Sequence, residues 1–115
     1  SSGNVFQGLN NIQGSSVPSS LKFKENIESI KIEKEAFEKL NPVSFNYKKE
    51  FSSDNSKKLG LIAEEVLKLG FKEAIIFDEN NEVYGIDYNF ILIALLYRYI
   101  ETCKELEELK RNIKT

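Results

Sequence analysis

The last third of the chain, from about Tyr88 to Lys114, contains no Gly or Pro and consists largely of residues that favour helices. Apolar residues recur in it at alternating spacings of three and four residues, the pattern of positions a and d in a coiled coil. These residues, called the seam below, are Leu92, Leu95, Tyr99, Thr102, Leu106, Leu109 and Ile113. The seam predicts a helix over about 88–114 that starts in the core and projects as a self-associating coiled coil. The alternative is an amphipathic helix packed only on its own core.

The apolar stripe on this helix is wider before Cys103 than after it. In the first part Ile93, Leu96 and Ile100 join the seam, which favours burial of this face against the rest of the domain. After Cys103, Glu, Lys and Arg occupy nearly every position outside the seam. Cys103 itself is most simply interpreted as a small buried apolar residue.

The region before the long helix shows shorter patterns. Pro42 ends a helical pattern, since Pro cannot continue a helix, and Gly70 is a suitable residue to end another. Asp87 is placed to cap the long helix. The expected elements are a strand or extended arm through 23–32, a helix over 33–40, a strand over 43–47, a polar loop over 51–58, a helix over 59–69, and a hairpin of 74–77 and 82–86. The predicted class is α+β, with short helices and small antiparallel β elements before the long C-terminal helix.

Charge divides the chain into two parts. Residues 1–21 contain no charged side chain, and Lys22 is the first. The opening stretch is rich in Ser, Gly, Asn and Gln, which fits either a flexible linker or the end of a β-rich stalk of a longer parent chain. The absence of Met favours a fragment of a longer protein, a processed product or a chain that carries a tag remnant. We therefore expect residues 1–18 to be stalk or linker and residues 19–115 to form one small domain.

Composition excludes several kinds of chemistry. The chain has no His and one Cys, so sites that need an imidazole, a disulfide or a cluster of thiolates are ruled out, and we expect no metal or cofactor. A net charge of -2 argues against nucleic-acid binding. The longest apolar run, Phe90 to Tyr97, falls short of the ~20 residues needed to cross a bilayer.

A Ser and a Lys five residues apart, Ser19 and Lys24, lie at the charge boundary. Without imidazole, a Lys amine is the most plausible base for a Ser hydroxyl, provided that burial or nearby cations lower its pKa from ~10.4 toward neutrality. Lys22 is close enough in sequence to help. By spacing alone the pair carries almost no information, because Ser and Lys are common, and a solvated basic arm is the favoured interpretation.

Four blocks of the sequence resemble one family, in order and with suitable spacing. They are SSLKFKENI, beginning at Ser19, then NPVSFNYK, LGLIAEEV and YGIDYNFILIALLYRYIETCKELEEL. Together they cover about residues 19–110. They resemble the endosialidase-type intramolecular chaperone domain, the self-cleaving C-terminal module of phage tail spikes and fibres.

The resemblance implies a function and a site. Ser19 would be the nucleophile, Lys24 its general base and Pro18–Ser19 the bond that is cut, in a single self-cleavage without a cofactor. The domain would form a homotrimer, promote folding of the upstream β-rich stalk of its own parent chain, and then detach. It would act in the host cytoplasm during virion assembly, with the parent fibre in the virion tail. Nucleic acid and membrane are not expected as partners.

Position 20 departs from the family pattern, because Ser20 stands where the family usually has Asp or Asn. Ser20 can still support the pair of Ser19 and Lys24, called the dyad below, by donating or accepting one hydrogen bond. Two alternatives therefore stay open. One is a trimerisation module that does not cleave. The other is the equivalent autoprocessing domain of a membrane-bound transcription factor of the myelin regulatory factor type.

Overall fold

The computed structural model describes residues 17–114, which belong to two compact units, Ser1–Ile30 and Lys31–Thr115. In the first unit, the described part contains one 3-10 turn, η1 (Leu21–Phe23). The sequence predicted a strand or an extended arm through 23–32; residues 24–33 form no strand. The predicted stalk or linker over 1–18 falls almost entirely outside the described residues.

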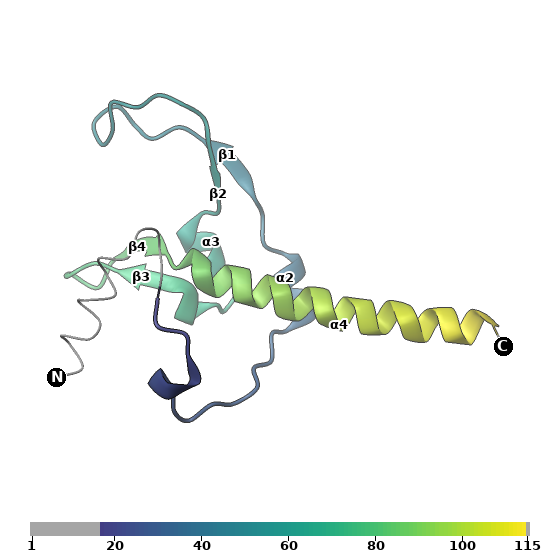
Figure 1. The fold of residues 1–115 in the computed structure, drawn as a ribbon. Coiled ribbons are helices and arrows are strands. Elements are labelled where there is room, and N and C mark those ends of the chain that lie inside the picture. The colour runs from purple at the N-terminus through teal and green to yellow at the C-terminus, as the bar shows by residue number, and fades with distance from the viewer. Residues whose placement is uncertain (1–16, 115) are drawn as a thin grey trace. The chain divides into compact units, whose positions relative to one another are not determined.

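The second unit combines short helices with two separate two-stranded antiparallel sheets (Figure 1). One sheet pairs β1 with β2, and the other pairs β3 with β4. In chain order the elements are α2 (Lys34–Glu38), β1 (Val43–Phe45), β2 (Lys58–Gly60), α3 (Ala63–Lys68), the 3-10 turn η2 (Lys72–Ala74), β3 (Ile75–Phe77), β4 (Val83–Ile86) and α4 (Tyr88–Lys114). The predicted α+β class and the long C-terminal helix are confirmed.

The prediction of a helix over 59–69 is wrong for the first residues of that range. Gly60 lies in β2 and pairs with Val43, and the helix α3 begins only at Ala63. Tyr88 explains why the chain stays extended here, because its hydroxyl accepts a hydrogen bond from the Leu61 N–H at 2.9 Å. A Cβ atom on Gly60 would lie 2.6 Å from that hydroxyl oxygen, so any other residue here would have to displace the Tyr88 side chain.

The end of α3 is as predicted. Gly70 adopts a left-handed φ of 99°, which an L-residue with a Cβ rarely tolerates. Its N–H donates to the Leu67 carbonyl at 2.9 Å, and the Phe71 N–H donates to the Val66 carbonyl at 3.3 Å. This pair of bonds is the Schellman motif, which satisfies carbonyls left free at a helix end. The motif also turns Phe71 back toward the core.

Aspartate side chains order both hairpin loops. Asp78 accepts backbone N–H bonds from Asn80 at 2.8 Å and Glu82 at 2.9 Å, which closes the predicted β3–β4 turn. In the β1–β2 loop, Asp54 accepts the Ser56 N–H at 2.8 Å and the Lys58 ammonium at 2.9 Å. These two hydrogen bonds hold the pKa of Asp54 below its ordinary value, and the bond from the Ser56 N–H has the larger effect.

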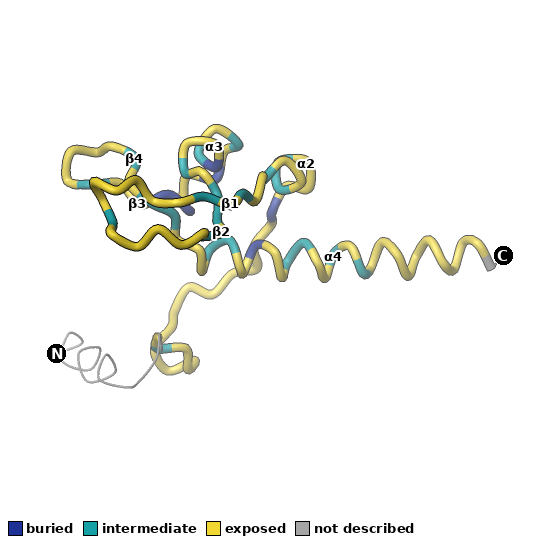
Figure 2. Tube along the Cα trace, turned by 90° about the horizontal axis from the view of Figure 1, so that it is seen from above, coloured by how far each residue is buried: buried dark blue, intermediate teal, exposed yellow. Residues whose placement is uncertain are grey.

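The core is small and receives one face of α4. Its buried residues are Ile32, Val66, Phe71, Ala74, Ile75 and Ala94. Phe90, Ile91 and Tyr97 of α4 pack against this cluster. Figure 2 shows that α4 carries no buried residue in its C-terminal half, and Figure 1 shows that this half extends beyond the other elements of its unit.

The sequence assigned the wrong residues of α4 to the core. Ile93, Leu96 and Ile100 were expected to be buried, but they are 46%, 52% and 44% exposed. The core contact is made instead through Ala94, which is 1% exposed. The small Ala side chain lets the helix approach the core closely, and the larger residues on either side of it are then turned outward.

The contact between Gly60 and Tyr88 generates a stability prediction. Gly60→Ala should lower the free energy of unfolding by about 1–3 kcal/mol, because the new methyl group displaces the Tyr88 hydroxyl. Gly85→Ala is the matched control in the other sheet, since a Cβ atom there meets open space. Urea unfolding followed by circular dichroism measures both variants. Equal stabilities for the two would contradict the assigned packing.

Candidate functional site

The segment that contains η1 folds back on itself and places Ser19 beside Lys24. The Phe23 N–H donates to the Ser20 carbonyl at 3.0 Å, and the Lys24 N–H donates to the Leu21 carbonyl at 3.1 Å. These two i to i+3 bonds close a tight turn between Ser19 and Lys24 and bring the two ends of the segment close together. As a result the Lys24 ammonium donates a hydrogen bond to the Ser19 hydroxyl, with 3.2 Å between Nζ and Oγ.

This pair has the reach that proton transfer needs. A general base lies roughly 2.6–3.2 Å from the atom that it deprotonates. With its proton removed, the Lys24 amine presents a lone pair to the Ser19 hydroxyl across the same 3.2 Å. The bond between Pro18 and Ser19 adjoins the hydroxyl, because its amide nitrogen belongs to Ser19 itself. Both side chains are exposed in the single chain.

The two residues proposed as support take no part in this contact. Lys22 lies with its ammonium over the Phe23 ring, 5.1 Å from the ring centroid. Ser20 uses its backbone carbonyl to close the turn, and its side chain makes no capping bond. Within the described part of the chain, the site is thus the Ser19–Lys24 pair alone.

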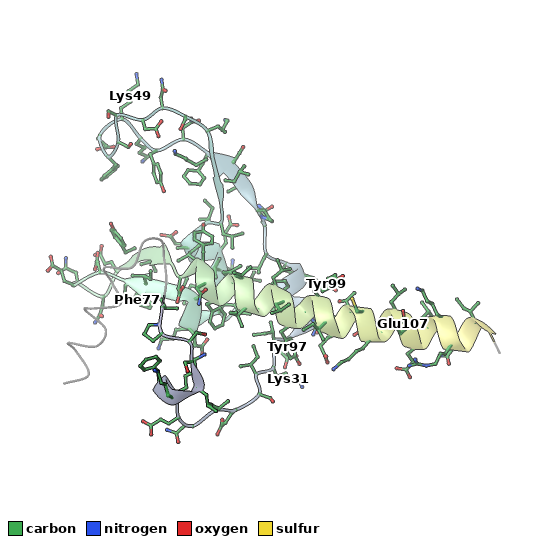
Figure 3. The ribbon with its side chains drawn as sticks, viewed as in Figure 1. Lys31, Lys49, Phe77, Tyr97, Tyr99 and Glu107 are labelled. Carbon is green, nitrogen blue, oxygen red and sulfur yellow. The ribbon has the colours of Figure 1, made fainter. Side chains whose placement is uncertain are left out.

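The seam of α4 is uncovered. Its large apolar residues are 50–75% exposed, namely Leu92, Leu95, Tyr99, Leu106, Leu109 and Ile113. Figure 3 shows Tyr97 and Tyr99 on different sides of the helix. Tyr97 packs against the core, whereas Tyr99 is 65% exposed. The helix therefore has one face in its own core and another that nothing in the described chain covers.

The surface of the seam is hollowed near the start of α4. Leu92, Leu95, Leu96 and Tyr99 line an open apolar hollow of about 320 Å³. Their spacing of i, i+3, i+4 and i+7 is that of the four residues that surround an inserted knob in a coiled coil. An isolated helix that packed only on its own core would have polar residues here.

Tyr99 and Cys103 interact one turn apart on this face. The pKa of Tyr99 is raised above its ordinary value. The largest cause is the hydrogen bond between the two side chains, and the next is the negative charge of the Cys103 thiolate. Cys103 is half-buried in the single chain, not buried as the sequence predicted.

The N-terminus of α4 is held as predicted, but one anchor farther along was missed. Asp87 accepts the backbone N–H of Asn89 at 3.0 Å and of Phe90 at 3.4 Å, as expected of a cap. Arg98 donates to the Ile32 carbonyl at 3.2 Å and so ties the start of the second unit to α4. The only sequence signal for this role was a single cation between two tyrosines in an otherwise apolar stretch.

Other kinds of site are not seen in the part of the chain that the structure describes. Residues 17–114 contain no group of acidic or Cys side chains placed to hold a metal ion. The same residues include no helix that is both long and apolar enough to span a membrane.

The first unit thus brings Ser19 and Lys24 into hydrogen-bond contact, and the second unit leaves the seam of α4 uncovered. Residues 19–76 match the family model described as chaperone of endosialidase, and the chain belongs to this family. The match begins at Ser19, includes Lys24 and ends in β3, so α4 lies beyond it. The general function is therefore that of a chaperone domain. The comparison with curated proteins gave no match.

The anchor at Arg98 is testable by substitution. Arg98→Met keeps the aliphatic stem but leaves the Ile32 carbonyl without its partner, which should cost about 1–3 kcal/mol of unfolding free energy. Arg111→Met, at an exposed position of the same helix, should change it by less than about 0.5 kcal/mol. Chemical denaturation of both variants gives the comparison, and an unchanged Arg98→Met variant would show that the anchor is dispensable.

Proposed function

We propose that the chain is a C-terminal intramolecular chaperone that trimerises a phage tail fibre or spike, promotes folding of the stalk that precedes it, and is released by cleavage between Pro18 and Ser19. The observation that carries this proposal is the uncovered seam of α4, in a chain that belongs to the chaperone of endosialidase family. The domain acts in the host cytoplasm during virion assembly, and the parent fibre stays in the virion tail.

The exposure of the seam supports assembly through it. Full burial of a Leu or Ile side chain is worth about 1.5–3 kcal/mol, so covering half-exposed side chains gains about half as much each. The charges beside the seam support parallel chains. With Leu92 at position a, Glu105 falls at position g and Lys110 at position e of the next heptad. In a parallel coiled coil these two positions lie opposite each other on neighbouring helices, so the charges attract.

The parallel arrangement of the helices explains how the domain would promote folding of the stalk. Helices that assemble in register bring the chains that precede them to the same level. Bringing separate stalk strands together has an entropic cost. Burial of the seam side chains offsets this cost before the stalk folds. The uncharged residues before Lys22 fit the end of such a stalk.

Cleavage proceeds in two steps at the Ser19–Lys24 pair. The Lys24 amine takes the hydroxyl proton as the Ser19 Oγ attacks the Pro18 carbonyl carbon. A bond from oxygen to carbon forms, the peptide C–N bond breaks, and the Ser19 nitrogen receives the proton from Lys24. Water then hydrolyses the resulting ester, which leaves a carboxylate on Pro18 and a free hydroxyl on Ser19. Holding the reacting groups together supplies up to ~7–11 kcal/mol of such a barrier.

Assembly is expected to precede cleavage. A Lys ammonium must lose its proton before it can serve as a base, and burial favours that loss. In the single chain both Ser19 and Lys24 are exposed to water. A surrounding surface supplied by the assembled trimer would desolvate the pair, so release follows correct folding.

The seam predicts how single substitutions change the oligomer. Leu106→Asp and Leu109→Asp should each convert the trimer to a monomer at micromolar concentration, because each places a charge inside the seam. Arg111→Asp introduces the same group at an exposed position outside the seam and should leave the trimer intact. Sedimentation velocity distinguishes these states. Trimers that persist in both seam variants would exclude assembly through the seam.

The dyad predicts which substitutions block release from a longer parent chain. Ser19→Ala should abolish cleavage, and Lys24→Ala should slow it by about 100-fold or more. Lys24→Arg keeps the charge but cannot act as a base, so it should fail as Lys24→Ala does. Lys22→Ala is the matched control and should be cut with a much smaller loss of rate.

The products identify the bond. Mass spectrometry should find a released fragment that begins at Ser19. An intact parent chain from an assembled trimer would favour a trimerisation module that does not cleave. A fragment produced equally well after Ser19→Ala would show that the dyad is assigned wrongly.

A further inference from the structure

A second apolar row runs along α4 beside the seam. It consists of Ile93, Leu96, Ile100 and Cys103, at spacings of three, four and three residues, and is called the second stripe below. Its first three residues are 46%, 52% and 44% exposed, and Cys103 is half-buried. The core of the same chain contacts α4 on a different face, centred on Ala94. The second stripe is thus apolar, exposed and separate from that core.

A coiled coil alone would leave the Ile residues of this row uncovered. With Leu92 at position a, Ile93 and Ile100 occupy position b, which faces solvent in a simple coiled coil. Leu96 and Cys103 occupy position e at the flank of the seam. Exposed Ile side chains at two successive b positions therefore need a partner other than the neighbouring helix.

The length of the second stripe indicates what that partner is. After Cys103, the next b and e positions are Glu107 and Lys110, both charged. The contact between Lys34 and Glu105, 3.5 Å long, lies near the same point along α4. The stripe therefore accompanies the part of α4 that lies beside the short elements of its own unit, residues 31–87, called the body below. Beyond the body the stripe stops.

Symmetry places a second body at that level. In a parallel trimer each neighbouring body lies at the same height along the helices, which is where the stripe is apolar. Each interface in a ring of three joins two different patches, one from each chain. The body also exposes large apolar side chains that can meet the stripe, among them Leu59 at 85%, Tyr84 at 78% and Phe51 at 76%.

The surface of the stripe is hollowed in the same way as the seam. Ile100, Cys103, Lys104 and Glu107 follow the i, i+3, i+4 and i+7 spacing, and with Tyr99 and Arg111 they line an open hollow of about 390 Å³. The apolar end of this hollow, at Ile100 and Cys103, belongs to the stripe, and its charged end, at Lys104, Glu107 and Arg111, lies beyond the stripe. This change in lining coincides with the end of the body.

We infer that the second stripe packs against the body of a neighbouring copy of this chain. The inference rests on the proposed trimer and adds a second contact to it. Each chain then holds its neighbour twice, through the seam of α4 and through the stripe.

Thiol reactivity tests the inference in the full chain. In a Cys103→Ser background, Ile100→Cys and Glu107→Cys place single thiols at the same heptad position, one heptad apart. Reaction with a chromogenic disulfide reagent should be at least ten-fold slower at position 100 than at position 107 in the native assembly. The two rates should become equal in urea. Ile93→Cys provides a second reading within the stripe and should be slow.

Sedimentation of the same samples separates this inference from the proposed function. A trimer in which positions 93 and 100 react as fast as position 107 would overturn the contact with the neighbouring body and leave assembly through the seam standing. A monomer would overturn both. A trimer with protection at positions 93 and 100 alone supports the two-point contact.

Discussion

The packing of the first turns of α4 on the core cluster is the contact on which the rest of the structure depends. Ala94 lets the helix approach closely, Asp87 caps its first turn, and Arg98 binds the start of the unit through the Ile32 carbonyl. This packing determines which face of α4 stays exposed to solvent. The core itself is too small to cover the remaining apolar faces of α4, so their side chains stay exposed in the single chain.

The elements that could be predicted from sequence are those with long or locally closed patterns. The helix α4 is uninterrupted by Gly or Pro, and the β3–β4 turn is closed by the side chain of Asp78 within the turn itself. The strand β2 could not be predicted, because Leu59 fits the helical spacing of the residues after it. The extended conformation of this segment depends on its pairing with β1 and on the hydrogen bond to Tyr88. Both partners are distant in sequence.

The candidate site was predictable in part for similar reasons. The seam follows from periodicity, whereas the run from Phe90 to Tyr97 is apolar on all sides and gives no signal of which side enters the core. The pairing of Ser19 with Lys24 came from the family resemblance, since a five-residue separation alone carries little information. The turn η1 supplies the physical reason for their proximity.

The central claim is that the uncovered face of α4 is an assembly surface, so the mass of the unmodified chain in solution tests it most directly. Sedimentation equilibrium at micromolar concentration should give a mass three times the 13.2 kDa of one chain. The same mass should persist on dilution until the subunits separate cooperatively. A stable species of 13.2 kDa under these conditions would contradict the account.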